Sequence, residues 1–76
     1  MITKKMINSI DELQEIQRQA TRASEDVAIA SLDGSINVDA KSFIGLFALD
    51  FSEPVLLVSE DEKFHKRVEH IGVTVE

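Results

Sequence analysis

One amphipathic segment limits how this chain can fold. Its apolar residues recur at every third or fourth position, at Ile10, Leu13, Ile16, Ala20 and Ala23. That spacing is typical of a helix with one apolar face, so it predicts a helix over residues 10–23. The apolar face is stabilised only when it packs on another layer of structure, and the rest of the chain must supply that layer.

The residues around this segment fit the two ends of a helix. Ser9 stands three residues before Glu12, which is the spacing of a capping box. Asp11 adds negative charge near the start, whereas Arg18 and Arg22 lie late. This order suits the helix dipole, because the positive end of the dipole is at the N-terminus.

Short strands are expected on both sides of the helix. Segments with strand-like alternation or apolar runs are residues 3–8, 27–32, 36–39 and 55–58. The pair Asp33-Gly34 predicts a hairpin between the second and third of them, because glycine accepts the positive φ of a tight turn. Pro54 falls at the start of the fourth strand. Lys4 and Lys5 are expected to be solvated residues at a strand edge.

Two further helices are indicated. Ser42 is a suitable N-cap for a short helix through about Ala48. Ser59 and Glu62 have the spacing of a second capping box, and Gly72 is expected to end that helix as its C′ residue. The apolar stripe of this last helix is Phe64, Val68 and Ile71.

The order of elements predicts one α+β domain over residues 1–76. Strands and helices this short favour a four-stranded antiparallel sheet with all three helices on one face. The chain has no cysteine, and no apolar run approaches the roughly 20 residues that cross a bilayer. Its formal net charge is −6, which disfavours a nucleic-acid partner. We expect a cytoplasmic protein that is bound neither to nucleic acid nor to a membrane.

The middle of the chain resembles a known family. The pair Lys41-Ser42, followed by Gly45, Leu46 and Leu49, resembles the serine-site segment of HPr, the phosphocarrier protein of the sugar phosphotransferase system. The resemblance is strongest from residue 26 to residue 58. It implies an HPr-like open-faced β-sandwich of four strands and three helices in the order βαββαβα, which is also the order read from the local signals.

The resemblance fails where the carrier chemistry is needed. The family has a Gly-Ile-His-Ala-Arg-Pro pattern at the start of its first helix, and residues 9–13 here contain no histidine, arginine or proline. The first histidine in the chain is His65. Phosphoryl transfer to histidine needs an imidazole nucleophile, and the carboxylates of Asp11 and Glu12 would repel the phosphoryl group.

Three functions therefore remain open. The first is an HPr-like regulatory or docking module without phosphocarrier activity, which is not an enzyme and needs no cofactor. Its partners would be proteins, such as components of the phosphotransferase system or an HPr kinase. The second is a genuine phosphocarrier protein, against which the missing histidine argues. The third is an unrelated small interaction domain that shares only the fold.

The candidate site residues come from the resemblance. In the family the serine that matches Ser42 is phosphorylated by a dedicated kinase, although Ser42 can also serve simply as an N-cap. The helix that follows is the family's docking surface, which implies partner contacts for Phe43, Ile44 and Phe47. The alternative places Phe43 and Phe47 in the core. Leu46 and Leu49 are assigned to the core.

One further cluster is considered as a metal site. Glu62, His65 and Glu69 share a face of the last expected helix, with His70 near its end. Carboxylate and imidazole groups can bind zinc. No thiol or further ligand supports the site, so a solvated helix face is the favoured interpretation and no metal is expected.

Overall fold

The computed structural model describes residues 1–42 and 49–75. Their elements in chain order are β1 (Ile2–Met6), α1 (Ile10–Arg22), β2 (Val27–Ser31), β3 (Asn37–Asp39), β4 (Val55–Ser59), α3 (Glu62–Arg67) and β5 (Val73–Thr74). The expected helix that begins at Ser42 lies outside the described residues, apart from Ser42 itself.

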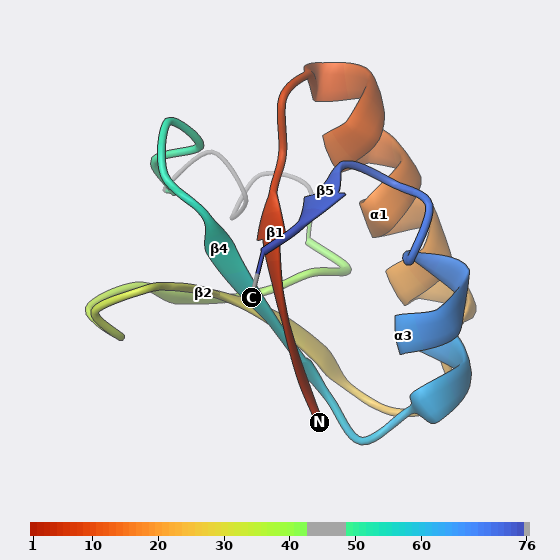
Figure 1. The fold of residues 1–76 in the computed structure, drawn as a ribbon. Coiled ribbons are helices and arrows are strands. Elements are labelled where there is room, and N and C mark those ends of the chain that lie inside the picture. The colour runs from red at the N-terminus through yellow and green to blue at the C-terminus, as the bar shows by residue number, and fades with distance from the viewer. Residues whose placement is uncertain (43–48, 76) are drawn as a thin grey trace.

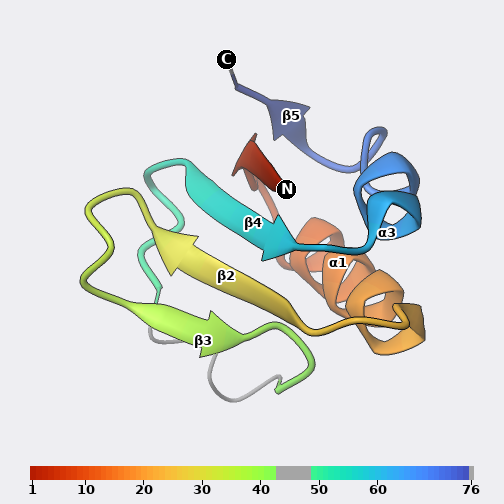
Figure 2. The same cartoon turned by 90° about the horizontal axis from the view of Figure 1, so that it is seen from below.

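The strands form one antiparallel sheet in the order β3-β2-β4-β1-β5. The helices α1 and α3 lie together on one side of it (Figures 1 and 2). The predicted α+β class is confirmed. The expected sheet of four strands was one strand short, because the residues after α3 turn back and pair with β1.

The core forms between α1 and the sheet. The buried face of α1 consists of Leu13, Ile16 and Ala20, and Ile16 is 0% exposed. Ile10 does not belong to this face, because it is 55% exposed in the first turn of the helix. The stripe prediction is therefore confirmed from Leu13 onward. The sheet supplies the opposite wall of the core with Val27, Ile29, Val55 and Leu57.

The hairpin between β2 and β3 is confirmed, but its loop is longer than a tight two-residue turn. Gly34 has a φ of +76°, as expected for the glycine of the turn. The carboxylate of Asp33 accepts hydrogen bonds from the Ser35 amide and from the hydroxyls of Ser31 and Ser35. These bonds stabilise the ionised form and lower the pKa of Asp33 to about 2.

The expectation that Lys5 is solvated was wrong. Lys5 is 0% exposed, and its Nζ donates a hydrogen bond to the Glu69 carbonyl oxygen at 3.1 Å. Its side chain lies on the inner face of the sheet, since Lys5 pairs directly with the buried Val55. Burial lowers the pKa of Lys5, and the carboxylates of Glu69 and Glu12 oppose that shift.

The boundaries of α3 also differ from the prediction. The N-cap is Asp61, whose side chain accepts from the amides of Lys63 and Phe64, whereas Ser59 ends β4. The helix ends at Arg67, so Gly72 is not its C′ residue. Phe64 and Val68 are buried at 0% exposure, and Ile71 packs against the core as part of the predicted stripe.

Gly72 instead lets the chain return to the sheet. Its φ is +66°, a conformation that residues with a Cβ rarely adopt. A Cβ at this position would lie 2.8 Å from the Met6 carbonyl oxygen. Glycine therefore permits the close approach that sets β5 beside β1, where Met6 pairs with Val73.

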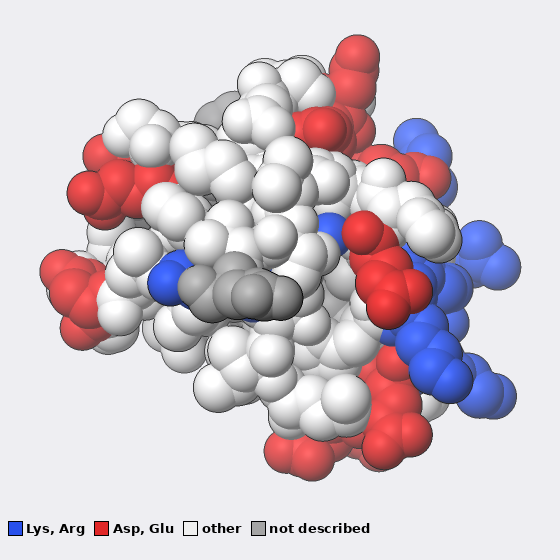
Figure 3. All heavy atoms as spheres, in the orientation of Figure 1, with Lys and Arg blue, Asp and Glu red and all other residues white. Residues whose placement is uncertain are grey.

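Charge is unevenly distributed over the surface. In Figure 3 the Lys and Arg side chains gather on the side where Figure 1 shows α1 and α3. The cations carried by these two helices are Arg18, Arg22, Lys63, Lys66 and Arg67. Because the whole chain has a formal charge of −6, its carboxylates dominate elsewhere.

Candidate functional site

The start of α1 is the place where the family resemblance locates the carrier chemistry. Ser9 is the N-cap, and its Oγ accepts a hydrogen bond from the Glu12 amide at 3.2 Å. The Glu12 carboxylate turns back and accepts from the Asn8 amide at 2.7 Å. The predicted capping box is thus present, with its reciprocal bond made one residue earlier than in the usual arrangement.

This arrangement is unsuited to holding a phosphoryl group. The Glu12 carboxylate lies at the positive end of the helix dipole, where a phosphate would otherwise be favoured. Asp11 adds a second negative charge in the same turn. Beside the helix start is a hollow of about 240 Å³ lined mainly by apolar side chains, including Ile7, Leu13 and Phe51.

Ser42 is exposed and lies three residues after the end of β3 at Asp39. Its amide donates to the Asp39 carbonyl oxygen at 3.0 Å, and the Lys41 amide donates to the Asp39 carboxylate at 2.9 Å. Asp39 therefore fixes the turn that presents Ser42. Phosphorylation of Ser42 stays a prediction.

The predicted docking residues Phe43, Ile44 and Phe47 lie outside the described residues, as does Leu46. Their assignment to a partner surface or to the core stays a prediction. Leu49, which was expected in the core, is buried at 7% exposure and joins the hydrophobic cluster.

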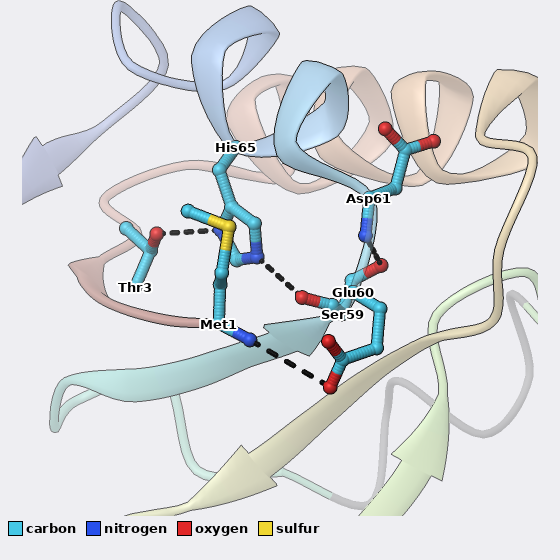
Figure 4. Close-up of polar contacts among 6 residues, drawn as sticks. All are labelled: Met1, Thr3, Ser59, Glu60, Asp61 and His65. Carbon is cyan, nitrogen blue, oxygen red and sulfur yellow. Dashed lines mark hydrogen bonds and ion pairs between the residues drawn. The ribbon is translucent and has the colours of Figure 1, made fainter.

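His65 is a structural residue of the core boundary. It is 8% exposed, and its side chain projects from α3 toward β1 and the end of β4, as Figure 4 shows. Its Nε2 is 3.0 Å from the Ser59 carbonyl oxygen, which can only accept, so Nε2 carries a hydrogen. Its Nδ1 is 2.7 Å from the Thr3 hydroxyl. Both ring nitrogens are therefore engaged within the fold.

The side chains that were considered as a metal site, and for which a solvated helix face was favoured, lie around one groove. Glu62, His65 and Glu69 line this groove of about 370 Å³, together with Lys66 and residues of β1 and β5. However, residues 1–42 and 49–75 contain no group of three or more histidine, cysteine or carboxylate side chains placed to hold a metal ion. His70 is exposed in the turn after α3.

Asp61 was not identified from the sequence, yet it joins the two helices. One carboxylate oxygen caps α3, and the other accepts from the amide of Ser24 at 2.9 Å and from its hydroxyl at 3.2 Å. These hydrogen bonds, with the Ser24 amide first, lower the pKa of Asp61. The signal available in the sequence was an aspartate directly before a helix, but Ser59 offered a competing cap.

Comparison with known proteins finds no family model, no curated protein and no solved structure that matches this chain. Within the part of the chain that the structure describes, neither helix is long and apolar enough to cross a membrane.

Proposed function

We propose that this protein is an HPr-like regulatory or docking module related to the sugar phosphotransferase system, without histidine phosphocarrier activity. The observation that carries the proposal is the start of α1. A carrier would need an imidazole there, and this chain has the Ser9 cap and the carboxylate of Glu12 instead.

The architecture supports the HPr-like assignment. The described elements β1, α1, β2, β3, β4 and α3 occur in the same order as in the family. Both described helices lie on one face of the sheet. β5 is a departure from the family's four strands. That departure favours a second candidate function, which is a small interaction domain that shares only this architecture.

The environment of His65 argues against this residue replacing the carrier histidine of the family. Phosphorylation requires a free ring nitrogen, and both nitrogens of His65 are in contact with Thr3 or Ser59. His70 is exposed, but it follows α3 and so has no helix N-terminus of its own to stabilise a phosphate.

The chemical test is incubation with phosphoenolpyruvate and Enzyme I, with a histidine-containing HPr as the positive control. We expect no acid-labile phosphate on this protein. The variants His65→Gln and His70→Gln serve to locate any signal. Acid-labile phosphate that mass spectrometry places on either histidine would overturn the proposal.

The docking test uses Phe47→Glu, with direct binding to Enzyme I or to an HPr kinase as the measurement. If Phe47 belongs to a docking surface, the variant keeps the circular dichroism spectrum of the wild type and loses binding. If Phe47 belongs to the core, the variant unfolds, because an unpaired buried carboxylate is very costly. Absence of binding by the folded wild type to either protein would favour the unrelated interaction domain.

Ser42→Asp tests the regulatory site separately. Aspartate is also a good N-cap and its charge suits a helix N-terminus, so we expect stability to be kept or slightly raised. A kinase that phosphorylates the wild type should leave this variant unmodified. A lower melting temperature of Ser42→Asp would contradict the proposed helix start at Ser42.

A further inference from the structure

The sheet has a second face, which neither α1 nor α3 covers. Figure 2 shows the broad faces of β2, β3 and β4, with α1 and α3 to their right. Residues that pair directly across neighbouring strands share a face, so the register identifies its side chains. One row across the sheet is Asp39, Ala28, Val58 and Ile2, and the next is Asn37, Ala30, Leu56 and Lys4.

This face is apolar for a surface in contact with solvent. Ile2 is 64% exposed, and Val73, which continues the face beside Met6, is 54% exposed. Val58 and Leu56, on the neighbouring strand β4, are half-buried. Contiguous exposed apolar side chains of this kind are typical of interaction sites, whereas single exposed residues are not informative.

Carboxylates border the apolar row. Asp39 ends the row on β3, and Asp26 and Glu60 lie along one side of it, next to Ala28 and Val58. A groove of about 450 Å³ runs over Ala28 and Val58, and Asp26, Asp39 and Glu60 contribute to its wall. The Glu60 carboxylate lies 4.0 Å from the Met1 ammonium with its side chain 89% exposed, so solvent screens that pair. The groove therefore combines an apolar floor with a negative rim.

We propose that this sheet face binds a cationic amphipathic segment of a partner protein. Apolar side chains of the segment would cover Val58 and Ile2, and its arginine or lysine would lie beside Asp26, Asp39 and Glu60. This surface is distinct from the family-type docking segment that follows Ser42, so the inference stands independently of the proposed function.

The spacing of the strands gives the length of the segment. Neighbouring strands lie about 4.8 Å apart, so the row from Asp39 to Ile2 spans about 14 Å. A helix rises about 1.5 Å per residue, and about ten residues would cover this distance. The cations should lie along one edge of the apolar stripe, because Asp26 and Glu60 lie on the same side of the row.

The negative charge of this face favours a cationic protein segment over a membrane, a nucleic acid or a second copy of the chain. An anionic membrane or a nucleic acid would be repelled by the rim and by the net charge of −6. A second copy of this chain would present the cations of α1 and α3. Within the described part of the chain, the large apolar residues that are exposed are Met1, Ile2, Ile10, Leu32 and Val73. None of them lies on α3 or on the second half of α1, so those cations have no exposed apolar stripe beside them.

The test uses a fluorescein-labelled helical peptide of about twelve residues, with leucines along one face and two arginines along one edge of that face. Its binding is measured by fluorescence anisotropy, and its site is mapped by amide chemical shifts. We expect saturable binding that shifts the amides of Ala28 and Val58. A peptide with glutamates in place of the arginines should not bind.

Two matched pairs of variants locate the surface. Asp26→Lys should weaken binding about fivefold or more, whereas Glu53→Lys, the same type of charge reversal on an exposed loop, should leave it within about twofold. Ile2→Ser should weaken binding, whereas Ile10→Ser, at a residue of similar exposure on α1, should not. Circular dichroism checks that all four variants are folded.

Several results would overturn the proposal. These are no saturable binding by the wild type at millimolar protein, equal effects within either matched pair, or equal binding of the glutamate peptide. Sedimentation of the wild type without peptide tests the second copy. Self-association that Asp26→Lys abolishes would assign the face to a dimer and reject a partner segment.

Discussion

Replacing Ile16 with alanine tests the central packing of the fold. Ile16 is 0% exposed on the inner face of α1, against the sheet. The change removes three carbon atoms, each worth about 0.8 kcal/mol of transfer free energy, which gives about 2.4 kcal/mol. The residual cavity adds to this, so the total loss should fall within about 2–5 kcal/mol.

That loss is large for a domain of this size. At roughly 0.05–0.15 kcal/mol per residue, a 76-residue domain has a free energy of unfolding of about 4–11 kcal/mol. One kcal/mol shifts the melting temperature of such a domain by about 4–8 °C, so we expect a decrease of at least about 10 °C. Urea denaturation and a thermal melt followed by circular dichroism would measure it.

The matched control is Ile10→Ala on the same helix. Ile10 is 55% exposed, so the same chemical change should alter stability by less than about 1 kcal/mol. Alanine is also the better helix former, which offsets part of any loss. If the two variants have the same melting temperature, the orientation of α1 on the sheet is wrong.

Three further predictions follow from individual contacts. Asp61→Asn should reduce the loss of stability on acidification. Because folding lowers the pKa of Asp61, its carboxylate stabilises the fold above the ordinary pKa of 3.8, and this stabilisation is lost as the pH falls through the pKa of the folded state. Melting temperatures from pH 7 to pH 2, with Glu25→Gln as control, would show it. Lys5→Met should abolish a gain in stability of the wild type as pH rises toward 10.5, since the folded protein releases the Lys5 proton before the unfolded chain does; Lys4→Met should keep that gain in the same titration. Gly72→Ala should cost roughly 1–3 kcal/mol in urea denaturation and more than Gly34→Ala, because a Cβ at Gly34 meets nothing within 4 Å; equal costs would show that the contact with Met6 is unimportant.

The helix and strand pattern could be predicted because each of those signals is local. The periodicity of α1, its Ser9 cap and the turn glycine Gly34 depend on residues a few positions apart. The expectation of a sheet packed against the helices then follows from the need to cover one apolar helix face, whereas the pairing of β2 with β4 was seen only in the structure. Ile10 was misplaced because a stripe at helical spacing does not show where the first turn leaves the core.

The errors at Lys5 and His65 came from contacts between distant parts of the chain. Lys5 is buried beside β5, which covers the edge of β1, and its Nζ donates a hydrogen bond to the carbonyl oxygen of Glu69, 64 residues away in sequence. His65 was interpreted as a surface residue, yet its partners are Thr3 and Ser59. A pattern of alternating residues contains no information on such partners, because each polar group is satisfied only once the tertiary structure is formed.

The two sides of the molecule offer different interactions to a partner. The helical side carries five of the cations, and the uncovered sheet face carries an apolar row bordered by carboxylates. A cationic segment on the sheet face would be held partly by charge, and the Debye length falls from about 10 Å at 0.1 M salt to about 3 Å at 1 M. A partner anchored by Phe43 and Phe47 would be held mainly by apolar contacts, which salt does not screen. The ionic-strength dependence of a bound partner therefore indicates which of the two surfaces it contacts, before any variant is made.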